Sequence, residues 1–323
     1  MAWSPRMRRR LWIGALLPLG LLASGCTADD LPRFGWPSGV TEQAKRMQHF
    51  WSWAFIAALA VGAVVWGLMF WAFIAYRKKK NSPLFPKQTK ENLPLEFTYT
   101  AVPLLMVGVL FYFTVTTENF VTKTVADPAV TVHVTASKWL WDFGMENTKS
   151  PDPGAPGADG FVHTVGTSDE VPILVLPVKQ NIEYVLESKD VIHSFWVVPF
   201  LFKRDVFPHP EANNTANRIQ NTIEQTGAFV GRCAEFCGTY HSAMNFEVRA
   251  VPQDVYTAYI DLRQQKDPAT GAGYTAAAAL SAVGKQFPSC GDLCSPRAIT
   301  TYPIDPLRTL RAGSKPVPLA GGK

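Results

Sequence analysis

The stretch Cys233-Ala-Glu235-Phe-Cys237-Gly-Thr-Tyr-His241-Ser-Ala-Met244 constrains the fold more strongly than any other part of the sequence. It places two thiols, an imidazole and a thioether close together along the chain. Cysteine and methionine are soft ligands, and together with histidine they select copper over hard cations. A blue-copper site uses a single cysteine, whereas two thiolates here indicate two copper ions that share both sulfur atoms.

Such a centre needs a second histidine from another part of the chain. His193, in Asp190-Val-Ile-His193-Ser-Phe, is the candidate because it stands at the end of an expected strand. Two other interpretations of the cysteine motif stay open. In an exported chain a Cys-x3-Cys pair can form a disulfide, and zinc also binds cysteine and histidine. Met244 favours copper, because a thioether is a soft ligand.

Charge is distributed unevenly along the 323 residues. The formal net charge is +7 over residues 1–127, −7 over residues 128–262 and +5 over residues 263–323, which adds up to the +5 of the whole chain. The central acidic block contains the metal motif, and acidic surfaces attract cationic partners. A plain solubilising role is the alternative. No basic stripe with interleaved aromatic residues indicates nucleic-acid binding.

The N-terminus has the pattern of an export signal. Arginines cluster between residues 6 and 10, an apolar run follows, and small residues precede Cys26. Residues 1–25 are therefore predicted to be a signal. Cys26 is predicted to become the lipidated first residue of the mature chain, with residues 26–49 as an exported segment. Ordinary signal cleavage beside an incidental cysteine is the alternative.

Two uncharged apolar stretches follow, residues 50–76 and 97–117. Each is long enough to cross a bilayer, which takes about 20 residues of helix. The basic run Arg77-Lys-Lys-Lys80 belongs in the cytoplasm, because positive charge marks cytoplasmic loops. We expect a two-pass protein of the cell (plasma) membrane, with residues 77–96 as a cytoplasmic loop. Everything after residue 118 would lie on the extracytoplasmic side, and membrane lipids are expected partners.

Residues 128–262 have the character of an all-β domain. Segments rich in β-branched residues recur at 130–136, 171–176, 182–187 and 246–251, as short strands do. Many short strands with few helical stretches indicate a sandwich or Greek-key barrel. The metal motif falls in a loop just before the last of these segments, and loops on a rigid β scaffold commonly carry function.

Residues 263–323 form a basic C-terminal extension rich in Ala, Gly and Pro. Residues 274–287 are predicted to form a short helix. Cys290 and Cys294 follow it without a neighbouring histidine, so the pair is not a covalent haem-attachment motif. A local disulfide is the favoured interpretation in an exported region, and a second metal site is the alternative.

Over residues 45–262 the chain resembles subunit II of haem-copper cytochrome c oxidases. The resemblance rests on the two-helix hairpin, on Asp190-Val-Ile-His193-Ser, on Ser137-Lys-Trp139-Leu-Trp141 and on the Cys-x-Glu-x-Cys-x3-His-x2-Met run. It implies a two-helix transmembrane hairpin plus a cupredoxin-like Greek-key barrel that holds a binuclear CuA centre of two copper ions.

The resemblance also implies a ligand set for that centre. Both cysteines would bridge the coppers, each histidine would bind one copper, and the methionine and a backbone oxygen would be weak ligands. The implied ligands are His193, Cys233, Glu235 through its backbone oxygen, Cys237, His241 and Met244.

Further roles follow from the same resemblance. The Glu235 side chain would bind a magnesium ion shared with subunit I, and Trp139 would be the residue at which electrons enter from cytochrome c. Glu96 would lie at the mouth of a proton channel into subunit I, although a plain interfacial glutamate is the alternative. Asp190 would belong to a docking patch. Expected partners are oxidase subunits I and III and a cytochrome, with haem present only in partner chains.

The chain departs from the family pattern in three places. An often acidic position is Gly144, for which nearby Asp142 and Glu146 could substitute. The stretch 146–170 is longer and richer in Pro and Gly than expected, and the extension 263–323 is an addition. We hypothesise that both additions dock a membrane-bound cytochrome, such as a cytochrome bc-type complex, in place of a freely diffusing one.

Three other functions fit parts of the pattern. A quinol oxidase subunit II shares the hairpin and barrel but lacks the copper ligands that this chain retains. A copper chaperone for oxidase assembly uses Cys-x3-Cys and a distant histidine, usually with one membrane anchor and a thioredoxin-like fold. A nitrous oxide reductase needs a large domain with many histidines, whereas this chain has 6 in total.

Overall fold

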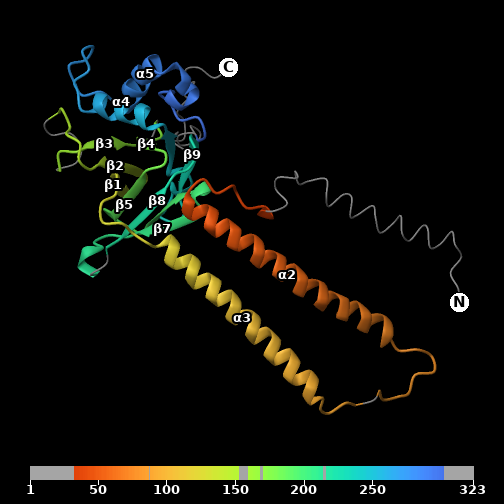
Figure 1. The fold of residues 1–323 in the computed structure, drawn as a ribbon. Helices are drawn as coiled ribbons and strands as arrows, with labels where there is room; N and C mark the ends of the chain where they lie inside the picture. The colour runs from red at the N-terminus through yellow and green to blue at the C-terminus, as the bar shows by residue number, and fades with distance from the viewer. Residues whose placement is uncertain (1–32, 87, 153–158, 168–169, 214–215, 302–323) are drawn as a thin grey trace, which may run out of the picture. The chain divides into compact units, whose positions relative to one another are not determined.

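The computed structural model describes residues 33–86, 88–152, 159–167, 170–213 and 216–301 (Figure 1). The predicted export signal and the lipidation site Cys26 lie outside the described residues. The chain divides into two compact units. One contains residues 48–115, and the other contains residues 39–47 and the chain from residue 116 onward.

Two long helices, α2 (Glu42–Ala75) and α3 (Leu93–Val121), are apolar and long enough to cross a membrane. They run in opposite directions and are joined by the loop that contains the basic run (Figure 1). Both helices extend beyond the predicted spans, 50–76 and 97–117, because polar first turns are capped. The Thr41 hydroxyl accepts a hydrogen bond from the Ala44 amide, and the Asn92 side chain accepts one from the Leu95 amide.

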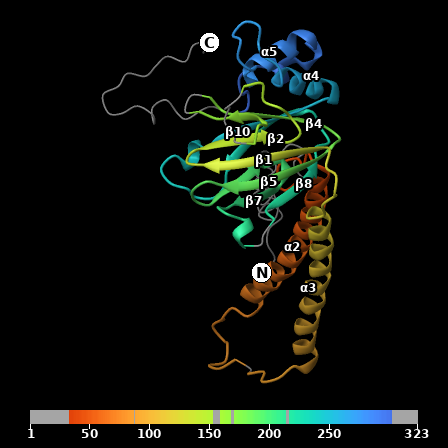
Figure 2. The same ribbon diagram turned by 90° about the vertical axis from the view of Figure 1, so that its left-hand side faces the viewer.

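The second unit is built on two five-stranded sheets. The first sheet has the order β3-β2-β1-β5-β8, and the second has the order β4-β10-β9-β6-β7. Figure 2 shows the first sheet face-on. The strands are β1 (Val130–Ser137), β2 (Leu140–Met145), β3 (Val162–Val165), β4 (Ile173–Pro177), β5 (Asn181–Ser188), β6 (His193–Val197), β7 (Phe202–Val206), β8 (Arg218–Thr222), β9 (Gly227–Cys233) and β10 (Asn245–Val251).

Each sheet is mixed. β1 pairs in parallel with β5, and β10 pairs in parallel with β4, while the other ladders are antiparallel. The two inner faces share one apolar core that includes Trp141, Tyr184, Phe195 and Phe246, all almost completely buried. This two-sheet arrangement of short strands is the predicted cupredoxin-like fold.

The segment before α2 belongs to the same domain. Val40 is 5% exposed and lies in the core between the sheets, and its carbonyl accepts the Glu224 amide. Thr41 forms a β-bridge with Ile223. The β domain therefore includes residues from before the first helix as well as the predicted span 128–262.

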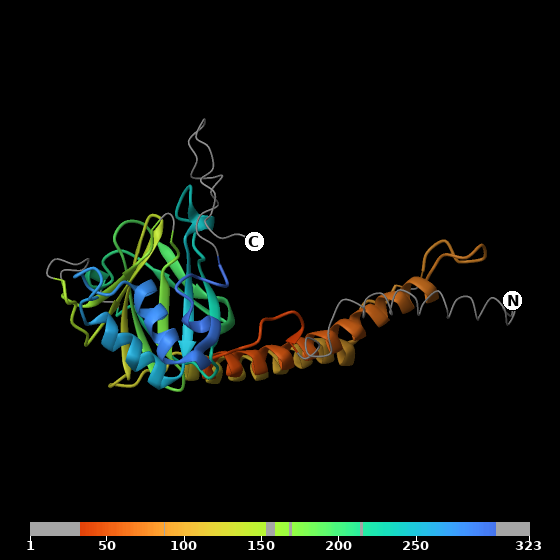
Figure 3. The same cartoon turned by 90° about the horizontal axis from the view of Figure 1, so that it is seen from above.

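The end of the β domain and the C-terminal extension together cover the outer face of the second sheet. α4 (Gln253–Arg263) and α5 (Ala276–Gln286) lie side by side against the strands (Figure 3), and a short 3-10 helix, η5 (Pro288–Cys294), follows. A second apolar core forms there from Ile173, Val175, Val251, Val255, Tyr259, Ala279, Leu280, Val283, Cys290 and Cys294. The described part of the extension is thus folded onto its own domain, and Cys290 and Cys294 are joined by a disulfide.

Candidate metal centre

Sheet pairing brings the distant histidine to the cysteine motif. β9 ends at Cys233, and β6 begins at His193. The two strands pair antiparallel, with Phe195 opposite Cys233, so His193 lies beside the start of the cysteine loop. The loop returns through a short 3-10 helix, η4 (His241–Ala243), and β10 begins directly after Met244.

The sulfur atoms of Cys233 and Cys237 lie 3.8 Å apart and are not bonded to one another. Each sulfur has an imidazole nearby. Nδ1 of His193 lies 3.8 Å from the Cys233 sulfur, and Nδ1 of His241 lies 3.6 Å from the Cys237 sulfur. The Met244 sulfur lies 3.9 Å from the Cys237 sulfur. The ligand atoms of His193, Cys233 and Cys237 all fall within 4.8 Å of one another.

A backbone oxygen completes the group of donors. The carbonyl oxygen of Glu235 lies 3.3 Å from the Cys233 sulfur, on the opposite cysteine from Met244. Each sulfur therefore has one imidazole and one weak donor nearby. The donors are thus grouped around two sulfurs, a set of thiolate, imidazole and thioether ligands that suits copper.

Asp190 fixes the orientation of His193. One carboxylate oxygen lies 2.8 Å from Nε2 of His193, and the other accepts the backbone amide of Lys138 at 2.7 Å. These contacts, with the Val191 amide, outweigh burial and lower the pKa of Asp190. An ionised carboxylate only accepts hydrogen bonds. Asp190 therefore holds the proton on Nε2 and leaves Nδ1, which faces Cys233, free to bind a metal.

The two thiols differ in acid strength in the metal-free chain. Burial raises the pKa of Cys237, and repulsion from the Cys233 sulfur raises it further. Burial acts in the same direction on Cys233, but hydrogen bonds with His193 and the backbone outweigh it and lower the pKa. Because the pKa of Cys237 is raised, binding a cation there must displace its proton.

Two tryptophans hold the metal loop from the first sheet. The indole N–H of Trp139 donates to the Cys237 carbonyl at 3.2 Å, and that of Trp141 donates to the Met244 carbonyl at 3.3 Å. Gly238 has a φ of +118°, and a side chain there would press on the Trp139 ring. Trp139 is only partly buried and packs edge-on against Tyr240, with ring centroids 4.8 Å apart.

Two of the contacts above involve positions to which sequence reasoning assigned no role. Trp141 was part of a quoted motif, but only the fold reveals that its indole reaches a ligand's backbone. Tyr240 lies inside the cysteine run, and its contact with Trp139 joins segments that are far apart in sequence. The Trp-x-Trp spacing was the available signal, since both rings come from neighbouring positions on one hairpin.

The chain matches a family model described as "Cytochrome C oxidase subunit II, periplasmic domain" over residues 159–251. It is 46% identical to the probable cytochrome c oxidase subunit 2 of Nocardia farcinica, over 96% of this chain and 92% of that protein. It is 40% identical to cytochrome c oxidase subunit 2 of Mycobacterium tuberculosis (strain H37Rv), over 93% of this chain and 90% of that protein.

The chain belongs to the cytochrome c oxidase subunit 2 family. Among solved structures, it is similar to the periplasmic domain of subunit II of cytochrome oxidase of Bradyrhizobium japonicum. The match has 24% identity and a TM-score of 0.32, and it covers 43% of this chain and 95% of that one. Family membership makes this a membrane protein whose β domain lies outside the cytoplasm, as part of a haem-copper oxidase.

Several acidic residues near the centre are paired with histidines. Besides the contacts of Asp190, the Asp142 carboxylate is buried and lies 2.8 Å from Nδ1 of His163. Glu146 lies 3.0 Å from Nε2 of His133. The suggestion that Asp142 replaces a missing docking carboxylate is therefore wrong, because its side chain is buried and paired with His163 of β3, the neighbouring strand.

Two other predicted roles involve the side chains of Glu235 and Glu96. The Glu235 side chain is partly exposed at the rim of the metal loop. Glu96 is in the first turn of α3, where its carboxylate accepts the Asn92 amide at 2.9 Å while Asn92 accepts the Leu95 amide. This reciprocal capping stabilises the start of the helix. Glu96 thus has a local structural role, whatever else it does in the assembled complex.

Proposed function

We propose that this chain is the subunit through which a haem-copper cytochrome c oxidase receives electrons, at a binuclear CuA centre. One observation carries the proposal: two unbonded thiols lie 3.8 Å apart, and each has an imidazole nitrogen within 3.8 Å. In the proposed centre Cys233 and Cys237 would hold the copper through their thiolates, together with the imidazoles of His193 and His241. Met244 and the Glu235 carbonyl would be weak ligands.

When bound, the two coppers would supply a site that takes up and gives back one electron. The chain's own residues keep the geometry of that site constant. His193, both cysteines and Met244 are buried, so water is excluded from most of the ligand set. Asp190 and the two tryptophans fix ligands through hydrogen bonds. A ligand set that cannot rearrange lowers the cost of changing the redox state.

Trp139 is the residue at which we expect electrons to enter. Its ring is partly exposed, and its N–H contacts the backbone of Cys237, so a short bonded path joins the surface to a bridging sulfur. The donor would be cytochrome c or a membrane-bound cytochrome, such as one in a cytochrome bc-type complex. Electrons would pass on to haem in subunit I, where oxygen is reduced to water and protons are pumped.

The remaining roles concern contacts with other chains. We propose that the Glu235 side chain binds a magnesium ion shared with subunit I, and that Glu96 lies at the mouth of a proton channel into that subunit. Subunit III would complete the complex in the plasma membrane. The partly exposed Glu235 rim and the position of Glu96 at a helix end support these roles.

Electron paramagnetic resonance with copper quantitation on the purified full-length chain tests the proposal. The full chain is needed because Val40 packs in the β core. We expect a seven-line hyperfine pattern with two coppers per chain, since one unpaired electron is shared equally. Cys237→Ser should give a four-line pattern, while Phe236→Leu, in the same loop but 77% exposed, should keep seven lines. A four-line wild-type spectrum would favour a copper chaperone.

A further inference from the structure

The outer side of β10 carries an ion pair that has no access to solvent. Along this strand Phe246, Val248 and Ala250 point into the core between the sheets. The alternate residues Glu247 and Arg249 face the extension, and both are 0% exposed. Their side chains contact one another directly. Because burying charge is costly unless every polar group is satisfied, such a pair needs further partners.

The partners come from the extension. Nη1 of Arg249 donates to the backbone carbonyls of Asp292, Leu293 and Ser295, and Nη2 donates to that of Arg297. We call these four carbonyls the carbonyl cage. Glu247 accepts the backbone amides of Ile299 and Thr300 at 2.8 and 2.6 Å. The ion pair is thus satisfied almost entirely by backbone groups of residues 292–300.

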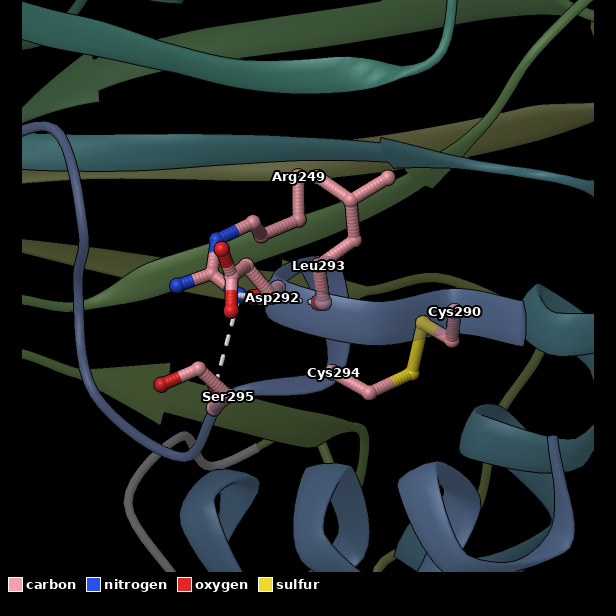
Figure 4. The surroundings of a disulfide bond; sticks show 6 residues. All are labelled: Arg249, Cys290, Asp292, Leu293, Cys294 and Ser295. Atoms are coloured by element: carbon pink, nitrogen blue, oxygen red, sulfur yellow. Dashed lines mark hydrogen bonds between the residues drawn. A yellow bond between two sulfur atoms is a disulfide. The ribbon is translucent and has the colours of Figure 1, made fainter. Parts of the chain in front are cut away.

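The disulfide closes the loop that provides two of the four cage carbonyls and directly precedes the other two. Cys290 and Cys294 bracket Asp292 and Leu293, and Figure 4 shows the Arg249 side chain reaching to this loop beside the disulfide. Carbonyl groups that converge on one cation repel each other, so the loop has little reason to adopt this shape without the arginine. A crosslink reduces the conformational freedom that the loop must lose. The disulfide and Arg249 therefore favour the same loop conformation.

β10 connects this contact to the metal loop. The strand begins one residue after Met244, whose carbonyl accepts the Cys233 amide at 3.1 Å. β10 pairs with β9, the strand that ends at Cys233. A shift of β10 would therefore change how the two ends of the metal loop meet. The extension holds the outer face of β10, while the inner face packs on Trp141 through Phe246.

We propose that Arg249 is a positioning residue for the metal centre, and that it acts through the carbonyl cage that the Cys290–Cys294 disulfide holds closed. Cage, disulfide and arginine form one latch that fixes the extension on β10. The latch is independent of the identity of the metal; only its effect on the copper spectrum rests on the proposed function.

The latch itself is tested on the metal-free full-length chain by limited proteolysis of the extension. Arg249→Lys keeps the charge but cannot bridge several carbonyls. We expect this variant, and a variant with both Cys290→Ala and Cys294→Ala, each to be cleaved at least about tenfold faster than wild type. Combining all three substitutions should add little, because either change already opens the latch. If the combined variant is instead cleaved faster by the product of the two separate increases, the arginine and the disulfide act independently and the latch proposal is wrong.

The effect on the metal centre needs a separate readout. In the copper-loaded chain, we expect Arg249→Lys and the cysteine-pair variant to change the copper hyperfine splitting at unchanged copper content. In the metal-free chain, alkylation of Cys233 and Cys237 should be faster in both variants. Arg232→Lys, on the exposed side of β9, is the matched control and should behave as wild type. A released extension with wild-type spectrum and alkylation would show that Arg249 is structural only.

Discussion

At the scale of single residues, the metal loop depends on side chains that bind no metal themselves. Asp190 joins a predicted ligand to the Lys138 amide, next to Trp139. Trp141 reaches the backbone of Met244 from the first sheet. Each contact holds a donor in one orientation before any metal arrives. Preorganisation of this kind is what distinguishes a specific metal site from a cluster of suitable side chains.

Asp190→Asn should therefore weaken the site without removing a ligand. An amide cannot hold the Nε2 proton of His193 as a carboxylate does, and its NH2 group would face the Lys138 amide. Loss of such outer contacts typically costs about 10–100-fold in metal affinity. Copper competition titration on the full chain measures the loss. Glu187→Gln, an exposed carboxylate on β5, is the control, and equal losses in the two variants would contradict the positioning role.

A second prediction at this scale concerns pH. Hydrogen bonds and charge interactions with Asp142 and Asp159 raise the pKa of His163 despite its burial. The backbone carbonyl of His163 also accepts a hydrogen bond from the Arg263 guanidinium. A raised pKa means that protonated His163 stabilises the fold below the unfolded value of 6.5, and that this contribution disappears as pH rises through the folded value.

His163→Gln should accordingly lose more stability near pH 6 than near pH 8, relative to wild type. Thermal unfolding of the full chain across this range measures the difference. Asp159→Asn removes only one of the two carboxylates and should show a smaller effect of the same sign. A constant difference between wild type and His163→Gln at all pH values would contradict the proposed charge interaction.

At the scale of elements, apolar alternation predicted β1, β4, β5 and β10 but not the other strands. β8, Arg-Ile-Gln-Asn-Thr, is mostly polar, because its Arg218 and Gln220 satisfy buried Glu183 on the neighbouring strand. β2 contains Asp142, which only the pairing with β3 and His163 makes tolerable. Such strands are specified by tertiary partners, which a single sequence does not display. The ligand spacing was predictable because most donors belong to one short loop.

The β9–β10 hairpin yields a prediction about packing. Gly231 lies opposite Phe246, and a Cβ at that position would fall well inside contact distance of the Phe246 ring. Gly231→Ala should overpack the core and cost about 1–3 kcal/mol of stability. Thermal unfolding of the full chain tests this. Gly108→Ala in α3, where a Cβ would meet open space, should be neutral, and a neutral Gly231→Ala would contradict the packing.

At the scale of the whole molecule, composition predicted a membrane hairpin, an acidic β domain and a basic extension, but it did not predict what the extension does. The hypothesis that it docks a cytochrome rested on its being additional to the family core. That hypothesis stays a prediction. The described residues of the extension bury part of the outer side of β4 and β10, including Ile173, Val175 and the Glu247–Arg249 pair. A sequence displays the charges of an added segment, whereas its apolar partners on a distant sheet become visible only in the fold.

Removing residues 264–323 should therefore destabilise the β domain. Truncation exposes the side chains of Ile173, Val175 and Val251, each worth about 1.5–3 kcal/mol when fully buried. It also removes the backbone partners of Glu247 and Arg249, which leaves a charged pair on an otherwise apolar face. Leu280→Ala in α5, almost fully buried, should cause a smaller loss of about 2–5 kcal/mol. Lys285→Ala on the same helix should cause little change. Thermal unfolding and copper content are measured for the truncated chain and for the two point variants. A truncated chain with wild-type values in both would mean that the extension is dispensable to the fold and is free to bind a partner.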